Sequence, residues 1–415
     1  MTQKYTIYSD ESGSDKSLNN RDEYYLNFDL SNNFRNYVRS YISVSTDDVQ
    51  DIENNLIDLE KKYFSQNYMD GKEIHAKDKI KISGNKGIEN LGGDTIKFME
   101  GLLNICEKIT VYIFTLNKME YIVQNSIKVV KKNLVTKEEV IYSLTKLFQN
   151  QQTEELMKIL FSQPTSITKK KFLDALKEIE DSLKNKKLKS TELRAVKDII
   201  TLVKKDIIQI LPQNSYKWDY EFEVINFLNL LKTDSIKIIF DEGNDIKNVM
   251  DVKKESQSIV TMTNNSAIVP GLRIADWFAT FFGKLLRSIS EALKVKDGKI
   301  NKANNETVLD LPYKWFNLNY QQFNLCKNIK KCIENNQIRF EVGNFADDLL
   351  FLLGYLKFIG DFETYEEFSS VQIEDLSKKY NTELTNIWHY YYSQQNIEFN
   401  PNELMSGILS DKVFN

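Results

Sequence analysis

The stretch that most clearly indicates the fold is Ser235-Ile236-Lys237-Ile238-Ile239-Phe240, which runs directly into Asp241-Glu242-Gly243-Asn244. Its β-branched and aromatic residues are typical of a buried strand. The chain opens with a similar strand, Lys4-Tyr5-Thr6-Ile7-Tyr8-Ser9, followed by the turn-forming cluster Asp10-Glu11-Ser12-Gly13. Each of the two strands is therefore expected to end in a pair of acidic residues.

Predicted strands and helices alternate between these two stretches, after a polar stretch over 14–36 that is expected to be a loop. The predicted elements are strands at 37–44 and 109–114, a short extended piece at 71–76, and helices at 49–64, 94–107 and 220–231. A strongly apolar helix is expected at 271–286. This alternation predicts an α/β fold with a mixed sheet flanked by helices.

A length of 415 residues suggests two or three domains, or one domain with large insertions. Residues 120–215 have few strand signals and carry Leu, Ile and Phe at three- and four-residue steps, which predicts a helical insertion. Residues 291–415 are again mostly helical and are expected to form a C-terminal region. The core is then divided into a first part, 1–119, and a second part, 216–290.

Composition excludes several classes of protein. The formal charge of −4 argues against a chain coated uniformly in basic residues, although it leaves a local basic groove open. The two histidines, His75 and His389, exclude His-rich zinc sites, and three scattered cysteines indicate a reducing compartment. P-loop, Rossmann, zincin and α/β-hydrolase motifs do not occur. Because there is no apolar run of about 20 residues and no signal-peptide pattern, we expect a soluble, cytoplasmic protein that does not contact a membrane.

Acidic residues stand at three places where a ligand site could form. Asp10 and Asp241 follow predicted strands, and α/β sheets build ligand sites at strand ends, although ordinary turn chemistry would also place an Asp there. Asp276 lies inside the apolar helix, where a charge costs several kcal/mol unless it is paired or holds a metal. An exposed flank of the helix, or a salt bridge to Arg273, would explain this residue too.

Glu73 and His75 lie in the polar piece Lys72-Glu73-Ile74-His75-Ala76-Lys77, and each alone is most simply a surface residue. Three or four carboxylates from two strand ends, this segment and the later helix could nevertheless converge in space. Such hard oxygen ligands suit Mg²⁺ or Mn²⁺. Two of these ions can activate a water and stabilise the leaving oxygen in phosphodiester cleavage.

Four motifs together resemble an uncharacterised bacterial family. They are Tyr8-Ser9-Asp10-Glu11-Ser12-Gly13, Lys72-Glu73-Ile74-His75-Ala76, Ile239-Phe240-Asp241-Glu242 and Leu272-Arg273-Ile274-Ala275-Asp276-Trp277. Members of that family begin with a Y-x-D-E-S-G signature and end with a Q-x-A-D-x-x-A helix. The family is regarded as ribonuclease H-like and is similar in carboxylate layout to metal-dependent nucleases and integrases. Its members often occur in mobile elements and phage-defence neighbourhoods.

The resemblance implies a catalytic, metal-binding set of four carboxylates: Asp10, Glu73, Asp241 and Asp276. It also implies that Glu11, Ser12, His75 and Lys77 lie near them. The candidate substrate-binding residues are Ser12, His75 and Lys77 from this set, and in addition Arg273. Arg273 departs from the pattern of the family, because it stands where the usual residue is Gln. This arginine could neutralise Asp276 and replace a metal, or it could grip a phosphate.

The leading hypothesis is a Mg²⁺- or Mn²⁺-dependent nuclease that hydrolyses phosphodiester bonds of DNA or RNA in phage defence or mobile-element biology. The alternatives are a catalytically degenerate ribonuclease H-like scaffold that binds nucleic acid or protein, and another metal-dependent phosphoryl reaction such as nucleotide hydrolysis. The stretch 169–205, with 12 Lys or Arg against 6 Asp or Glu, could guide a nucleic-acid backbone or could be a solvated helix face. A defence-system protein is a further expected partner, and the aromatic-rich C-terminal helices could form a homodimer.

Overall fold

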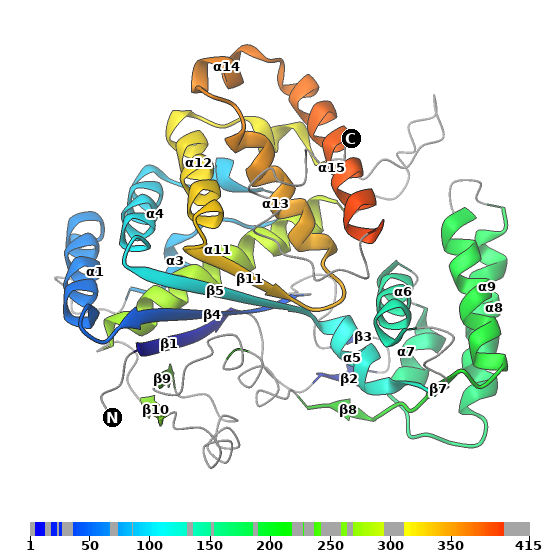
Figure 1. The fold of residues 1–415 in the computed structure, drawn as a ribbon. Coiled ribbons are helices and arrows are strands. Elements are labelled where there is room, and N and C mark those ends of the chain that lie inside the picture. Colours follow the sequence, from blue (N-terminus) through cyan, green and yellow to red (C-terminus); the bar gives the residue numbers. More distant parts are fainter. Residues whose placement is uncertain are drawn as a thin grey trace.

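The structure is a computed structural model, which describes residues 5–12, 18–22, 25–26, 36–66, 74–84, 86–130, 136–150, 153–185, 190–217, 227, 236–241, 259–263, 269–293 and 311–393. Its centre is a six-stranded mixed sheet with helices packed against it (Figure 1). The α/β class expected from the sequence is therefore confirmed. Within the described ranges, no helix combines the length and the apolar character that crossing a bilayer requires.

The sheet has the strand order β10-β9-β1-β4-β5-β11. Its strands are β1 (Tyr5–Ser12), β4 (Asn36–Ser45), β5 (Ile109–Asn117), β9 (Ile236–Asp241), β10 (Ile259–Thr263) and β11 (Ile338–Val342). β1, β4 and β5 form an antiparallel meander. β9 and β10 join in parallel on the β1 side, and β11 joins in parallel on the β5 side. The carboxyl ends of all these strands except β4 therefore lie along one edge of the sheet.

The acidic cluster after Ser9 is not the turn that the sequence predicts. Asp10, Glu11 and Ser12 continue β1 in antiparallel pairing with β4. The turn preference of Asp is overridden because the ten residues of β4 extend the ladder beyond Ser9. The stretch expected to be a loop also contains two short strands, β2 (Leu18–Asp22) and β3 (Tyr25–Leu26), and β2 pairs with both β3 and β8 (Ser215–Tyr216).

The C-terminal region contributes a strand to the sheet as well as helices. β11 pairs with β5 along its whole length, and this strand was not among the elements expected in the mostly helical region after residue 291. β10 was not predicted either. The helix expected at 220–231 falls outside the described residues, apart from Phe227.

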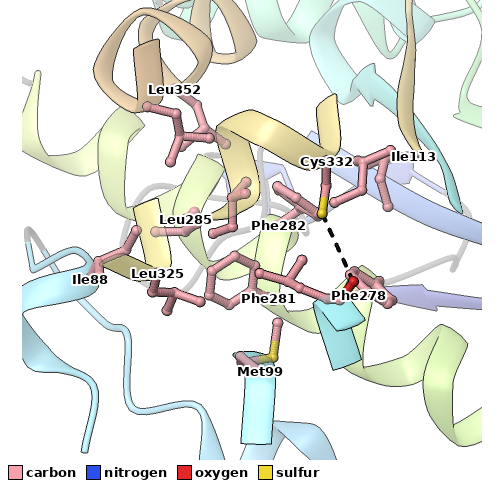
Figure 2. Packing of buried hydrophobic residues seen from close by; sticks show 14 of the residues in the cluster. Ile88, Met99, Ile113, Phe278, Phe281, Phe282, Leu285, Leu325, Cys332 and Leu352 are labelled. Atoms are coloured by element: carbon pink, nitrogen blue, oxygen red, sulfur yellow. Dashed lines mark hydrogen bonds between the residues drawn. The ribbon is translucent and has the colours of Figure 1, made fainter. Parts of the chain in front are cut away.

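One face of the sheet is covered by α11 (Pro270–Ala292) and by helices that pack around it (Figure 1). They are α1 (Val49–Tyr63), α4 (Gly93–Ile105), α12 (Tyr320–Glu334), α13 (Asp347–Gly360), α14 (Tyr365–Ser370) and α15 (Ile373–Ser393). Figure 2 shows Phe278, Phe281 and Phe282 of α11 surrounded by apolar side chains from β5, α4, α12 and α13. The Cys332 thiol of α12 donates to the Leu103 carbonyl at 4.0 Å in the same core. Because α11 is enclosed in this way, it is apolar around most of its circumference.

The opposite face belongs to a second core, in which Ile7 and Tyr41 of the sheet pack with the helices that follow β5. These are α5 (Lys118–Ser126), α6 (Lys137–Asn150), α7 (Glu154–Leu160), α8 (Thr168–Leu183) and α9 (Ser190–Lys204). Two short strands within them, β6 (Ile127–Val129) and β7 (Ile208–Ile210), pair antiparallel. Tyr41 stacks on Phe227 with ring centroids 3.9 Å apart. The range expected to be a helical insertion thus holds five helices in its described residues.

α11 lies very close to β1, and two glycines make this possible. A Cβ atom on Gly271 would stand 2.5 Å from the Tyr8 ring, and one on Gly283 would stand 2.7 Å from the Ser12 hydroxyl oxygen. Any larger residue at either position would push the helix off the strand. Gly283 is seven residues after Asp276 and therefore lies on the same side of α11, so this side of the helix approaches the sheet.

The loop after β11 is fixed by a buried carboxylate, Glu120 of α5, which is 0 % exposed. Its Oε1 accepts hydrogen bonds from the Asn344 backbone and side chain and from Gln124, and its Oε2 accepts one from the Phe345 backbone, all between 2.7 and 3.0 Å. A Cβ atom on Gly343 would stand 2.5 Å from this carboxylate. Glu120 therefore joins the helical segment that follows β5 to the end of the edge strand.

Replacing Glu120 by glutamine should change how stability depends on pH. Burial raises the pKa of Glu120, although the hydrogen bonds to its oxygens oppose the shift. The folded state then binds a proton on Glu120 more tightly than the unfolded state does. The stability that this proton adds is fully present below the unfolded pKa of about 4.3, and it is lost as pH rises through the folded pKa. We expect urea unfolding to show the wild type gaining stability relative to Glu120→Gln as pH falls from neutral toward the unfolded pKa of about 4.3. Parallel pH profiles for the two proteins would contradict this role.

Candidate functional site

Two of the predicted metal ligands occupy neighbouring positions in the sheet. β1 and β9 are parallel, and their register continues to Ser9 opposite Phe240. Asp10 and Asp241 are the next residue on each strand, so their backbones lie side by side, about 4.8 Å apart. In-register positions of parallel strands belong to the same face of a sheet. For Asp10 this is the face of Tyr8, against which α11 packs.

Asp10 itself is half-buried, and its Oδ1 accepts a hydrogen bond from the Glu11 backbone N–H at 2.7 Å. The residue opposite Asp10 on β4 is Ser40. The Ser40 hydroxyl donates to the Ala275 carbonyl of α11 at 2.7 Å. The turn of α11 that carries Asp276 therefore lies against the sheet position next to Asp10.

Both oxygens of the Asp276 carboxylate accept hydrogen bonds. The Thr280 hydroxyl, one helical turn further along α11, donates to Oδ1 at 2.9 Å. The backbone N–H of Ala76 donates to Oδ2 at 2.9 Å. These two donors fix the orientation of the carboxylate, while lone pairs on each oxygen can accept further bonds.

The bond from Ala76 brings the second motif of the sequence to the third aspartate. Ala76 begins a short helix, α3 (Ala76–Lys79), and His75 is the residue before it. His75 is half-buried, whereas Lys77 is exposed. The segment around His75, which sequence alone could not distinguish from ordinary surface, is therefore attached to α11 beside Asp276.

Two predicted ligands cannot be placed in the same detail. Glu73 lies outside the described residues, and of Asp241 only the backbone is described. Among the side chains that the structure does describe, no group of three His, Cys, Asp or Glu residues could hold a metal ion. The geometry thus brings Asp10, the Asp241 backbone and Asp276 to one edge of the sheet.

Arg273 is held by a partner that the sequence analysis did not identify. Its Nε and one terminal nitrogen donate to the two carboxylate oxygens of Glu60 on α1, at 2.8 and 2.9 Å. The side chain of Glu60 is 2 % exposed and that of Arg273 is 11 % exposed, so the ion pair is buried. Arg273 therefore links α11 to α1 through a bidentate contact, the geometry in which guanidinium binds carboxylate most strongly.

A signal for this pair is present in the sequence. Glu60 continues the buried stripe of α1 at four-residue steps after Ile52 and Leu56. A glutamate on the apolar stripe of a helix requires a buried cation, because an unpaired charge there would be too costly. The arginine in the apolar helix at 271–286 is the matching residue.

The remaining predicted residues near Asp10 serve contacts within the protein. The Glu11 carboxylate forms an ion pair with Arg39 of β4, at 2.9 Å from its terminal nitrogen. Arg39 is 1 % exposed and also donates from Nε to the Tyr37 hydroxyl at 2.7 Å. Ser12, predicted to contact substrate, is buried and packs under Gly283 of α11.

Comparisons with protein-family models, curated proteins and solved structures returned no match. A functional assignment must therefore be built on this edge of the sheet and on the residues around it.

Proposed function

We propose that the protein is a Mg²⁺- or Mn²⁺-dependent nuclease that hydrolyses phosphodiester bonds. The observation that carries this proposal is the in-register placement of Asp10 and Asp241 on parallel strands, beneath the helix that bears Asp276. Three acidic residues that are far apart in the sequence thereby have their backbones at one edge of the sheet. A role in phage defence or in mobile elements rests on the sequence resemblance alone.

The chemistry of these residues fits a hard divalent cation, for which carboxylate oxygens are the preferred ligands. Asp276 is oriented in advance by Thr280 and Ala76, as is typical of a ligand that is supported by its surroundings. Asp10, Asp241 and Asp276 would hold the metal, with Glu73 as the fourth ligand implied by the resemblance. When bound there, the ion would supply an activated water and charge stabilisation for the leaving oxygen.

The arrangement of strands also supports a ribonuclease H-like core. The first three strands of the sheet form an antiparallel meander, and two later strands extend it in parallel from the side of the first strand. In this arrangement the acidic ends of β1 and β9 are neighbours, which agrees with the carboxylate layout that the resemblance implies. β11 and the helices α5 to α9 would then be additions to this core.

The test is a cleavage assay with single- and double-stranded DNA and RNA, in the presence of Mn²⁺ or of a chelator. We expect cleavage of at least one of these substrates with Mn²⁺ and none with the chelator. Thermal unfolding supplies an independent measurement. Binding of the metal to the folded state should stabilise it, by about 2.7 kcal/mol at a metal concentration one hundred times the dissociation constant. A protein that cleaves nothing and gains no stability from Mn²⁺ would contradict the proposal and favour a non-catalytic scaffold.

A further inference from the structure

α11 holds a segment of chain along its surface, which we call the lysine segment (residues 76–86). Three residues at four- and eight-residue steps along α11 make the contacts: Asp276, Lys284 and Ser288. Asp276 accepts from the Ala76 N–H, whereas the Lys284 ammonium donates to the Lys77 and Ile80 carbonyls at 2.7 and 2.6 Å. The Ser288 hydroxyl donates to the Gly84 carbonyl at 3.0 Å and also to the Lys86 carbonyl.

These contacts give the lysine segment a defined direction. It begins beside Asp276 and runs with α11 toward Ser288, and twelve residues of helix correspond to about 18 Å. Figure 1 shows α3, the first part of the segment, next to α11. The backbone carbonyls point to α11, so the segment is anchored through its main chain and its lysine side chains are not needed to hold it.

The charge of the lysine segment is strongly positive. Lys77, Lys81 and Lys86 are exposed, and none of the three forms an ion pair with the described part of the chain. The segment carries one acidic residue, Asp78. Burial is the main cause that lowers the pKa of the Lys284 ammonium; the neighbouring Lys81 adds to this shift, and Asp78 and Asp276 oppose it.

An exposed aromatic residue stands beyond the far end of the segment. A Cβ atom on Gly87 would lie 2.7 Å from the Trp315 ring, so the chain after Lys86 packs directly on the short helix η5 (Tyr313–Phe316). Trp315 is buried there, whereas Tyr313 of the same helix is 60 % exposed. A lysine series is thus followed by an aromatic ring that is accessible from solvent.

We propose that the lysine segment binds the sugar–phosphate backbone of a single-stranded nucleic acid, which runs along α11 from Asp276 to Tyr313, where a base stacks. Successive lysines match the successive charges of a phosphate backbone, and sequence-independent binding of single strands combines such a basic track with aromatic stacking. The inference rests on the proposed function in one respect, because the strand would reach the aspartates where cleavage is proposed. It assigns nucleic-acid binding to the lysine segment rather than to the basic stretch 169–205.

The stretch 169–205 provides a matched control. Its lysines on α8 and α9 are also exposed, but several are engaged in local ion pairs, such as Lys169 with Asp206 at 2.7 Å and Lys184 with Asp181 at 2.6 Å. Figure 1 shows α8 and α9 at the side of the molecule remote from α1 and α3. Lys170, Lys171 and Lys197 are exposed, so reversing their charges changes the net charge as much as reversing Lys77, Lys81 and Lys86 does.

The experiment measures binding of a fluorescent thymidine oligonucleotide by anisotropy, in a chelator, so that neither metal nor cleavage is involved. With Lys77→Glu, Lys81→Glu and Lys86→Glu combined, we expect the dissociation constant to rise at least about tenfold at about 0.1 M salt. The slope of log affinity against log salt should become shallower by about 2, since each lost contact with a single strand removes about 0.7. Lys170→Glu, Lys171→Glu and Lys197→Glu combined should leave the constant within about twofold. Tyr313→Ala should weaken binding of the single strand about tenfold, and binding of a duplex much less.

Equal weakening by the two triple variants would overturn the proposal, because it would show a general effect of charge. Absence of oligonucleotide binding would also overturn the proposal. So would displacement of the bound oligonucleotide by polyglutamate of equal charge as effectively as by unlabelled oligonucleotide, and that result would indicate an acidic protein as partner. Because binding is measured without metal, failure here is distinct from failure of the proposed nuclease. If the protein cleaves with Mn²⁺ but the triple lysine variant binds the oligonucleotide as well as the wild type does, the proposed nuclease function stands and the proposed binding path is wrong.

Discussion

Asparagine in place of Asp10 is expected to reduce Mn²⁺-dependent cleavage by about 1,000-fold or more, which corresponds to about 4 kcal/mol of transition-state stabilisation. The substitution removes one carboxylate from the edge of the sheet where the Asp241 backbone and Asp276 lie. It should leave the fold intact, because the Oδ1 of asparagine can still accept the Glu11 N–H. The melting temperature without metal should therefore stay close to that of the wild type, while the stabilisation by Mn²⁺ should be lost.

The control for this variant is Asp58→Asn on α1, which removes one negative charge from an exposed position. It should retain both cleavage and stabilisation by metal. Cleavage at the wild-type rate by purified Asp10→Asn protein would reject Asp10 as a ligand. Loss of cleavage together with a large drop in melting temperature would show instead that Asp10 supports the fold.

Methionine in place of Arg273 should destabilise the fold by about 3 to 5 kcal/mol, because it leaves the Glu60 carboxylate buried without its cation. The side chain of Glu60 is 2 % exposed and receives two hydrogen bonds from the guanidinium. Methionine keeps much of the aliphatic volume of arginine, so lost packing contributes little. Urea denaturation of wild type and variant at neutral pH measures the difference directly.

The same pair allows a double-mutant cycle. Glu60→Leu combined with Arg273→Met replaces both charges by apolar side chains and should recover most of the lost stability, since a buried ion pair is often no more stable than an apolar pair. A single Arg273→Met variant that loses less than about 1 kcal/mol would show that the pair is weaker than its geometry indicates. If the double variant loses as much stability as Arg273→Met alone, the loss comes from packing and not from an unpaired charge.

The parts of the fold that could be predicted from sequence are those with strong periodicity. α1 and α4 show apolar residues at helical spacing, and β5 and β9 are rich in β-branched residues, so their positions follow from local pattern. α11 is apolar around most of its circumference and was correctly expected to be a buried helix.

Other features depend on partners that are distant in the sequence. β11 has only five residues, lies between two helices and is a strand because β5 offers it an open edge. Asp10 belongs to β1 rather than to a turn because β4 continues beside it. The ion pair of Glu60 with Arg273 can be predicted only by asking which cation compensates a carboxylate on the apolar stripe of a helix. Glu73 and the side chain of Asp241 lie beyond what the structure describes, so their part in the site stays a prediction.

The late position of β11 in the chain has a consequence for synthesis on the ribosome. β5 ends at Asn117, but the strand that covers its free edge ends only at Val342, more than 200 residues later. At about 5 to 20 residues per second, this edge of β5 stays uncovered for about 11 to 45 s during synthesis. An uncovered strand edge is a template for wrong pairing, so nascent chains of intermediate length should depend on chaperones far more than the finished protein does.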